Sequence, residues 1–170
     1  MGIFDIHIDT DGKFTGQINH LHKEIFKERN ALHITQICEP YVPNRVEREK
    51  LTVVALDEKN NVMGWSMGEF NDVGAYYMRN SAVWTDMRRV GVYTELIKFL
   101  DSYLLDRGCY VMESLHHPSN NGVLIAKLKN GFKIHGIEVD VQFGTLVKLK
   151  KYIKSEANDV FDKRVGYKKW

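Results

Sequence analysis

The chain has few cysteines and no long apolar run, and each shortage excludes a class of protein. Cys38 and Cys109 are the only cysteines among 170 residues, too few and too far apart in sequence for a disulfide framework. No segment approaches the roughly 20 apolar residues of a membrane helix. The first residues also lack the basic segment and apolar run of a secretory signal. We therefore expect a soluble, cytoplasmic protein.

A large excess of charge is missing as well. The formal net charge is +2, which argues against a general nucleic-acid or membrane-surface protein. Basic clusters at 148–154 and at Lys168 and Lys169 are local exceptions, and RNA binding through this end of the chain is one alternative. With 44% hydrophobic residues, the chain is able to bury a core without metal or disulfides. We expect no metal site, one domain over residues 1–154, and a tail over 155–170 that is a docked helix or partly disordered.

Residue spacing predicts strands and helices in mixed order. Apolar, β-branched runs bounded by turn formers predict strands at 3–8, 51–56, 62–70, 75–84, 109–115, 132–139 and 143–149. Helical spacing predicts helices that begin at Thr15, at Val92 and near Ser119 or Asn120. Residues 30–50 contain two prolines and are interpreted as irregular with short helical turns. Short turns make the strands at 51–84 three successive antiparallel neighbours.

The most informative segment is 82–97, where a strand-like run breaks at a basic turn and resumes with helical spacing. Arg88, Arg89 and Gly91 lie at the start of the predicted helix. The first N–H groups of a helix have no partner within it and carry part of the helix dipole, so this turn favours an anion. Guanidinium groups add a charge that persists at any working pH. The segment therefore predicts a cofactor with a diphosphate.

The order of elements and these residues together resemble the GNAT superfamily of N-acetyltransferases, which use acetyl-CoA. The family's pyrophosphate signature is an Arg or Gln, two residues, Gly, one residue, and then Gly or Ala. Residues 88–93 meet it except that Tyr93 stands at the last, small position. Asn120 and the pair Gly131 and Phe132 match a second family segment, an Asn at a helix start and a Gly-Phe pair at its end. The resemblance covers roughly 51–149 and implies an α/β fold of the α+β type. Its central sheet is expected to be mixed, mostly antiparallel and flanked by helices, with two strands splayed at the cofactor site.

The resemblance also implies how acetyl-CoA is held. The strand before the turn is expected to pair its backbone with the pantetheine arm at Val83 and Thr85, with Trp84 on the opposite face. The turn amides from Arg89 to Thr94 are expected to hold the diphosphate, and Asn120 to contact the arm. The implied cofactor-binding set is Val83, Trp84, Thr85, Arg88, Arg89, Val90, Gly91, Val92, Tyr93, Thr94 and Asn120.

The positions that transfer protons in many relatives hold other residues here. The two base positions correspond to Tyr77 and Arg79, and the tyrosine that often protonates the thiolate corresponds to Lys127, so the usual general acid is expected to be absent. We predict His116 as a catalytic residue because its unperturbed pKa lies near neutrality and a strand runs into the cofactor loop there. A loop histidine bonded to backbone is the alternative. Tyr77 is the second candidate, acting through water, with a core aromatic as its alternative.

The function implied by the resemblance is transfer of acetyl from acetyl-CoA to a primary amine. Residues 30–50 and the later strands are expected to rim the acceptor groove. Acidic residues there are compatible with either a cationic small molecule or a peptide amine: Glu69, Asp72, Glu138 and Asp140. No nucleic acid or membrane is expected as a partner, and a homodimer is left open. A non-catalytic acyl-CoA-binding regulatory module is the alternative function, favoured by the altered proton-transfer positions.

Overall fold

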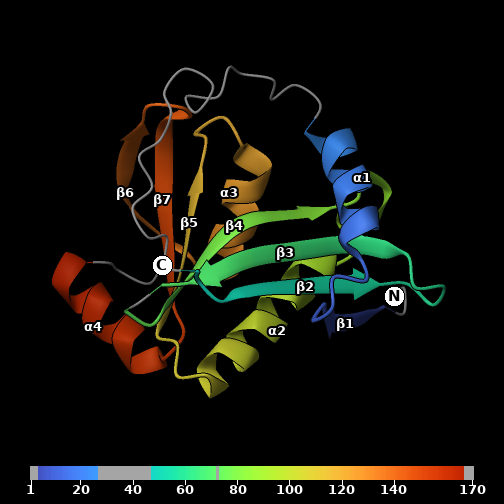
Figure 1. Ribbon diagram of the computed structural model, residues 1–170. Helices are drawn as coiled ribbons and strands as arrows, with labels where there is room; N and C mark the ends of the chain where they lie inside the picture. The colour runs from blue at the N-terminus through green and yellow to red at the C-terminus, as the bar shows by residue number, and fades with distance from the viewer. Residues whose placement is uncertain (1–3, 27–46, 72, 167–170) are drawn as a thin grey trace.

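The structure, a computed structural model, describes residues 4–26, 47–71 and 73–166 (Figure 1). One seven-stranded sheet lies at its centre, in the order β1-β2-β3-β4-β5-β7-β6. Every neighbouring pair of strands is antiparallel except β4 and β5. The strands are β1 (Asp5–Ile8), β2 (Lys50–Leu56), β3 (Val62–Phe70), β4 (Ala75–Val83), β5 (Val111–His116), β6 (Lys133–Asp140) and β7 (Gly144–Tyr152). The helices are α1 (Thr15–Ile25), α2 (Val92–Asp106), α3 (Asn121–Lys129) and α4 (Ser155–Val165), with a short 3₁₀ turn at Thr85–Met87.

The predicted fold class is confirmed, down to three successive antiparallel strands in β2, β3 and β4. The predicted start of the fifth strand, at Cys109, was two residues early, because β5 begins at Val111. The Cys109 N–H donates to the Leu104 carbonyl at 2.9 Å, so this residue closes α2 rather than opening β5. The prediction of irregular structure at 30–50 falls largely on residues 27–46, which lie outside the described residues, as do Cys38 and Asp72.

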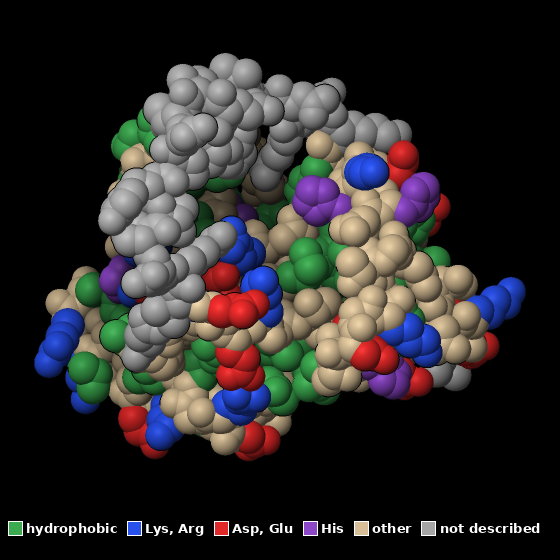
Figure 2. Space-filling model, viewed as in Figure 1, with side chains coloured by type: hydrophobic (Ala, Val, Ile, Leu, Met, Phe, Trp, Pro, Cys, Tyr) green, Lys and Arg blue, Asp and Glu red, His purple; other side chains and the backbone are tan. Residues whose placement is uncertain are grey.

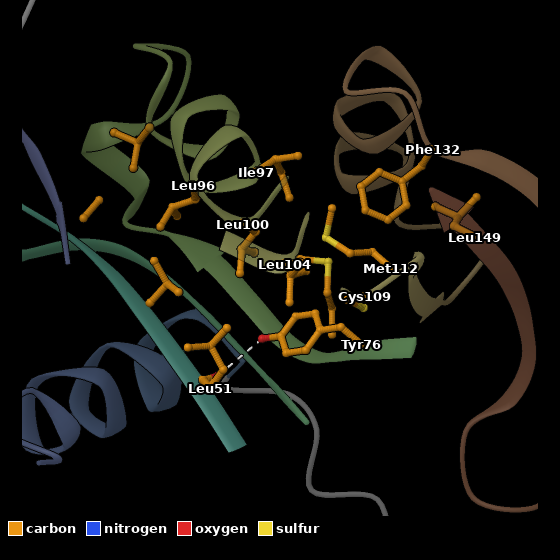
Figure 3. Packing of buried hydrophobic residues seen from close by; sticks show 14 of the residues in the cluster. Leu51, Tyr76, Leu96, Ile97, Leu100, Leu104, Cys109, Met112, Phe132 and Leu149 are labelled. Carbon is orange, nitrogen blue, oxygen red and sulfur yellow. Dashed lines mark hydrogen bonds between the residues drawn. The ribbon is translucent and has the colours of Figure 1, made fainter. Parts of the chain in front are cut away.

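Helices cover both faces of the sheet, and α1 and α2 each pack an apolar stripe against it. On one face, Phe14 and Ile18 pack against a cluster that includes Val54 and Trp65. On the other face, α2 packs against β2, β3 and β4, and its neighbours there include Tyr76 and Met112 (Figure 3). Phe132, at the end of α3, belongs to this second cluster, so α2 and α3 lie on the same face.

The parallel strands β4 and β5 pair over a short length and then separate. Ala75, Tyr76 and Tyr77 pair with 111–113, whereas β4 continues to Val83 and β5 to His116. Figure 1 shows the two strands running in different directions beyond this point. Each strand stays paired on its other edge, β4 with β3 and β5 with β7. Their facing backbone groups therefore line an opening, and the predicted splay of two strands is confirmed.

A β-bulge in β4 lies next to the point of separation. Met67 pairs with Asn80 and Gly68 pairs with Met78, which leaves Arg79 as the extra residue. A Cβ at Gly68 would lie 2.4 Å from the Tyr76 ring and 2.4 Å from the Tyr77 carbonyl oxygen, so glycine is required there. The bulge bends β4 away from its former direction, which is what bulges do beside functional sites.

The last helix packs on the far end of the sheet. Phe161 of α4 lies 5.4 Å, centroid to centroid, from both Tyr152 and His135. The Asn158 side chain donates to the Tyr152 carbonyl at 2.8 Å, and Asp162 forms an ion pair with Lys133. Residues 155–165 thus form a helix attached to β6 and β7. Within the described ranges, no helix has the length and hydropathy to span a membrane.

Candidate active site

The turn between β4 and α2 contains two residues in the left-handed region. Arg89 has φ 65° and Gly91, the N-cap of α2, has φ 94°. Glycine adopts this conformation freely, whereas arginine there costs roughly 1–2 kcal/mol. The Glu95 N–H donates to the Gly91 carbonyl at 3.1 Å, which closes the first turn of α2. The N–H groups of the preceding helical residues therefore point out of the helix end, as an anion site requires.

The Arg88 side chain lies against the open edge of β4. Its Nε donates to the Val83 carbonyl at 3.3 Å. The Trp84 N–H donates to the Met63 carbonyl at 2.8 Å, so this residue directs its backbone toward β3. Because backbone groups alternate along a strand, those of Val83 face the opening. The structure thus brings the Val83 backbone, the Arg88 guanidinium and the start of α2 to one place.

Trp84 contributes to a cavity on the opposite face, beside α1. The cavity has a volume of about 380 Å³ and lies between α1, the β2–β3 turn and the 3₁₀ turn. Its lining residues are Gln17, His20, Leu21, Asp57, Asn61, Val62, Met63, Trp84 and Met87. Of the residues predicted to bind the cofactor, only Trp84 lines it, so this cavity is separate from the opening between β4 and β5.

Tyr93 carries a buried hydroxyl that has no hydrogen-bond partner among the described residues. Burial raises the pKa of this phenol, which keeps it protonated. Ile97, one turn later on the same side of the helix, lies on the side of α2 that faces α3 (Figure 3). Buried polar groups are nearly always paired, so a lone donor between these helices fits a polar group supplied by a ligand.

The ends of α3 explain its Asn and Gly-Phe residues. Asn120 is the N-cap, yet its side chain makes no capping hydrogen bond. Gly131, with φ 85°, ends the helix in a Schellman motif. Its N–H donates to the Leu128 carbonyl and that of Phe132 to the Lys127 carbonyl, both at 3.1 Å. This motif folds Phe132 back over Lys127.

The two predicted catalytic residues lie on opposite faces of the sheet. Tyr77 pairs in register with Glu113, so their side chains share a face. His116 is three residues beyond Glu113 on the uninterrupted strand β5, and its side chain therefore points to the other face. The His116 Nε2 lies 3.1 Å from the Ser114 hydroxyl. The structure does not bring His116 and Tyr77 together.

Tyr77 lies in a half-buried, charged environment. Burial raises the pKa of its phenol, the Arg79 charge opposes this, and the carboxylates of Glu138, Glu69 and Asp140 add to it. The phenol is therefore protonated at neutral pH and suits a hydrogen-bond donor better than a base. Figure 2 shows acidic and basic side chains mixed at the centre of this face.

The acidic residues on this face already have partners, which are basic side chains for Glu69 and Glu138 and backbone N–H groups for Asp140. Glu69 bridges Arg48 at 3.4 Å and Arg79 at 3.0 Å. Glu138 lies 3.6 Å from Lys148. Asp140 accepts the N–H groups of residues 142 and 143 at 2.8 Å, which stabilises the β6–β7 turn. These carboxylates therefore do not form an uncompensated negative surface.

Lys127 is the functional candidate that sequence reasoning did not select. It is 1% exposed, its ammonium donates to the Met78 sulfur at 3.1 Å, and it lies 4.2 Å from the centroid of the Phe132 ring. Burial lowers its pKa to about 7. The available signal was its place four residues before Gly131, where a Schellman motif brings an aromatic residue over it. Among the described residues, no group of three or more His, Cys, Asp or Glu is arranged to hold a metal ion.

Comparison with known proteins connects these features. The sequence matches the model of the Acetyltransferase (GNAT) family over residues 16–132, more than half of the chain. The ribosomal-protein-S18-alanine N-acetyltransferase from Escherichia coli is 16% identical, with a TM-score of 0.65 over 89% of this chain and 95% of that one. The spermidine/spermine N-acetyltransferase from Vibrio cholerae is 11% identical, with a TM-score of 0.64 over 92% and 96% of the two chains.

A third structure contains the ligand itself. The putative streptothricin acetyltransferase from Bacillus anthracis, in complex with acetyl coenzyme A, is 17% identical, with a TM-score of 0.56 over 64% of each chain. This chain spans about two thirds of the length of that protein and of nourseothricin acetyltransferase. No curated protein sequence matches the chain. At these identities the structural likeness is one of fold.

Proposed function

Because this chain belongs to the GNAT family of acetyltransferases, we propose that it transfers the acetyl group of acetyl-CoA to the primary amine of a small molecule or peptide. The observation that carries the proposal is the opening between β4 and β5 with the N-terminus of α2 at its mouth. Acetyl-CoA is the co-substrate, and it supplies a thioester already activated toward an amine.

The residues around the opening divide the binding among them. The N–H groups at the start of α2 and the guanidinium groups of Arg88 and Arg89 bind the diphosphate. The Val83 backbone faces the opening and is suited to pair with the amide groups of the pantetheine arm. Two further polar groups are available to the same ligand. They are the Tyr93 hydroxyl, which has no partner among the described residues, and the Asn120 side chain, which makes no capping hydrogen bond. Their number and placement fit a long ligand with a charged end and amide groups.

Transfer of the acetyl group then depends on the orientation of the amine toward the thioester and on proton transfer. Holding an amine against a bound thioester is worth up to about 7–11 kcal/mol of the barrier. The acceptor must be a neutral amine when it attacks, so its ammonium form must lose a proton first. Tyr77 is protonated and half-buried near the separation of β4 and β5, but its side chain lies on the opposite face of the sheet from His116, so we do not assign both residues to the acceptor nitrogen. His116, at the open end of β5, is the residue proposed to carry the acceptor's proton away.

The choice of a primary amine as acceptor is supported by the substrates of structural neighbours and not by the charge of the protein surface. The names of two structural neighbours specify amines, the alanine of a ribosomal protein in one case and spermidine or spermine in the other. Because Glu69 and Glu138 are paired with basic residues, this face does not favour a polycation over a single amine. A primary amine on a small molecule or a peptide is therefore the acceptor that we propose.

The test combines binding with amine-dependent release of CoA. Acetyl-CoA is titrated into the protein while the melting temperature is followed, and free thiol is then measured during incubation with polyamines, amino sugars, amino acids and short peptides. We expect a higher melting temperature and release of CoA that requires one amine class. Stabilisation without release across the panel would support the regulatory acyl-CoA-binding module instead, and absence of stabilisation would overturn both.

A further inference from the structure

β6 forms one edge of the sheet and carries apolar side chains that face water (Figure 1). It is bonded to β7 alone, so the backbone groups of its other edge have no strand beside them in the described ranges. Three of its side chains are 59%, 72% and 80% exposed, those of Ile134, Ile137 and Val139. An edge strand with exposed apolar residues is a template for pairing with another chain, and monomers normally avoid it.

These three apolar side chains lie on one face of the sheet. Their partners on β7 are Leu149, Val147 and Thr145, which alternate along an uninterrupted strand and therefore share a face. Leu149 belongs to the core that α2 covers. The face is thus the one that α2 packs against elsewhere in the sheet, and at β6 it is open to water. We call Ile134, Ile137 and Val139 the apolar row of β6.

The polar side chains of β6 lie on the other face of the sheet. The register between β6 and β7 shifts at 134–136, which leaves His135 as an extra residue. This residue lies beside Tyr152 of β7, three residues beyond Leu149 and therefore on the opposite face. The same face holds Lys133, Glu138 and Asp140, whose partners on β7 are at 150, 146 and 144. The ammonium and the imidazole thus come first along β6, and the two carboxylates come last.

This order of groups makes β6 complementary to a second copy of itself. A two-fold axis perpendicular to the sheet sets two β6 strands antiparallel and keeps each face continuous. One register sets apolar residues opposite apolar ones and the carboxylates opposite the ammonium and the imidazole, by the pairs Lys133 with Asp140, Ile134 with Val139 and His135 with Glu138. Each pair shares a face, and no like charges oppose one another. The symmetry forms every pair twice, as an isologous contact requires.

The apolar surface at this edge is large for a monomer. It continues along the chain at the tip of the β6–β7 hairpin, where Val141 is 81% exposed and Phe143 54%. With the apolar row, these side chains present roughly 600 Å² to water, the upper end of what a typical monomer exposes in one patch. The backbone and polar side chains of β6 add to this area. The total comes close to the about 800 Å² that each partner buries in a stable interface.

The opposite edge of the sheet, β1, is protected in the usual way. It is four residues long, and its two exposed side chains are those of Asp5 and His7. Ile6 and Ile8 are partly buried against the core. A short edge strand with polar residues facing water does not favour pairing with another chain. Of the two edges of the described sheet, β6 is therefore the one suited to a partner.

We propose that the chain forms a two-fold symmetric homodimer in which the β6 strands of two copies pair antiparallel and continue one sheet across both. The two apolar rows meet on one face, and the basic start of each strand faces the acidic end of the other. β5 and β7 lie between β6 and β4 in the sheet, so the opening between β4 and β5 stays accessible in both copies. The contact does not depend on acetyl transfer.

The oligomeric state of the whole chain tests the proposal. Sedimentation is measured over a range of concentrations for the wild type, for Ile137→Lys and for Val73→Lys, a control whose side chain is 69% exposed between β3 and β4. We expect the wild type and the control to have twice the mass of one chain. Ile137→Lys should raise the dissociation constant of the dimer about 100-fold, because a charge enters the apolar surface twice in each dimer. A monomeric wild type, or a dimer that Ile137→Lys leaves unchanged, would overturn the proposal.

Cysteine cross-linking tests the register without a destabilising charge. Ile134→Cys and Val139→Cys are purified separately, mixed and oxidised, with the wild type as the control for the native cysteines. Opposite residues of the two strands lie about 5 Å apart, within reach of a disulfide, whereas two copies of position 134 lie roughly 15 Å apart. We expect the mixture to cross-link and each variant alone to stay at the level of the wild type. A mixture that does not cross-link above either variant alone would contradict the pairing.

Discussion

The two helices beside the opening between β4 and β5 differ in length and in the side chains that they bury. α2 is 15 residues long and buries five apolar side chains, Val92, Leu96, Ile97, Leu100 and Leu104. α3 is 9 residues long, and the one residue that it buries is Lys127. α2 is thus a packed support whose end binds an anion, whereas α3 gives up apolar packing to hold an amine in the interior. In this molecule, the apolar packing and the one buried charged residue of the described ranges are on separate helices.

The largest expected effect tests α2 as the support. Leu100→Ala removes a side chain with 0% exposure and leaves a cavity, which should lower the free energy of unfolding by about 2–5 kcal/mol. Urea denaturation measures it. Leu128→Ala on α3, where the side chain is 41% exposed, is the matched control and should cost less than about 1 kcal/mol. Equal losses in the two variants would mean that the helices share the packing after all.

The second prediction is that a substitution on α3 increases the free energy of unfolding. Lys127→Met should raise the free energy of unfolding at pH 6 by about 2–4 kcal/mol, because it removes the cost of burying an ammonium. The free energy that corresponds to the lowered pKa, roughly 4 kcal/mol, is the upper limit of that cost. The folded pKa of about 7 lies below the unfolded value of roughly 10.4, so the unfolded chain binds more protons between them. The gain should therefore be complete below pH 7 and decline as the pH rises toward 10.

Urea denaturation at pH 6, 8 and 10 checks this second prediction, with Lys129→Met as the control that stays close to the wild type at each pH. A gain for Lys127→Met that is the same at all three values would show that packing, not charge, explains it. A loss of stability at pH 6 would contradict the burial of an uncompensated ammonium.

The third prediction concerns the anion-binding end of α2. Arg88→Ala and Arg89→Ala should each raise the dissociation constant of CoA about tenfold, because each removes a guanidinium from the place assigned to the diphosphate. Calorimetric titration of CoA at two salt concentrations measures this, and the effect should shrink at high salt. Arg107→Ala, at the other end of α2, is the matched control and should leave binding unchanged. The same loss in all three variants would contradict a local site.

The smallest effect is expected at Tyr93. Tyr93→Phe removes a buried hydroxyl without a partner, so the protein without ligand should become more stable by about 1 kcal/mol. Binding of CoA should weaken several-fold, since the hydroxyl is assigned to the ligand. Thermal denaturation and calorimetry follow the two changes. Tyr103→Phe on the same helix removes a hydroxyl that accepts from Arg107 at 3.0 Å, and it should not weaken binding.

Those parts of the fold that depend on neighbouring residues in the chain could be predicted. β3 has the expected bounds, and the start of α2 lies directly after the left-handed Gly91. An apolar run bounded by turn formers favours a strand, and a glycine before a segment with helical spacing favours a helix start, because both preferences are local. The start of β5 was misplaced because the N–H of Cys109 closes α2, and apolar content does not distinguish the two uses of that residue.

The candidate site was less predictable, since it depends on which groups become neighbours. Tyr77 and His116 were selected together, yet strand pairing sends them to opposite faces. Glu69 and Glu138 were regarded as acidic groups for an acceptor, yet each has a basic partner. Neither outcome is written in the spacing of residues along the chain, because it follows from the register between strands that are distant in sequence.

The sequence by itself was enough to predict the order of strands and helices along the chain, the basic turn, and the glycines at the start of α2 and the end of α3, Gly91 and Gly131. The same residues carry the resemblance to the family. All of these arise from bonds and contacts within a few residues. Folding in three dimensions was needed for the properties of Lys127 and Tyr93, a lysine with a pKa of about 7 and a hydroxyl without a partner. The free energy of a polar group depends on how much water and how many partners the surrounding elements leave to it, and those elements meet only in the packed protein.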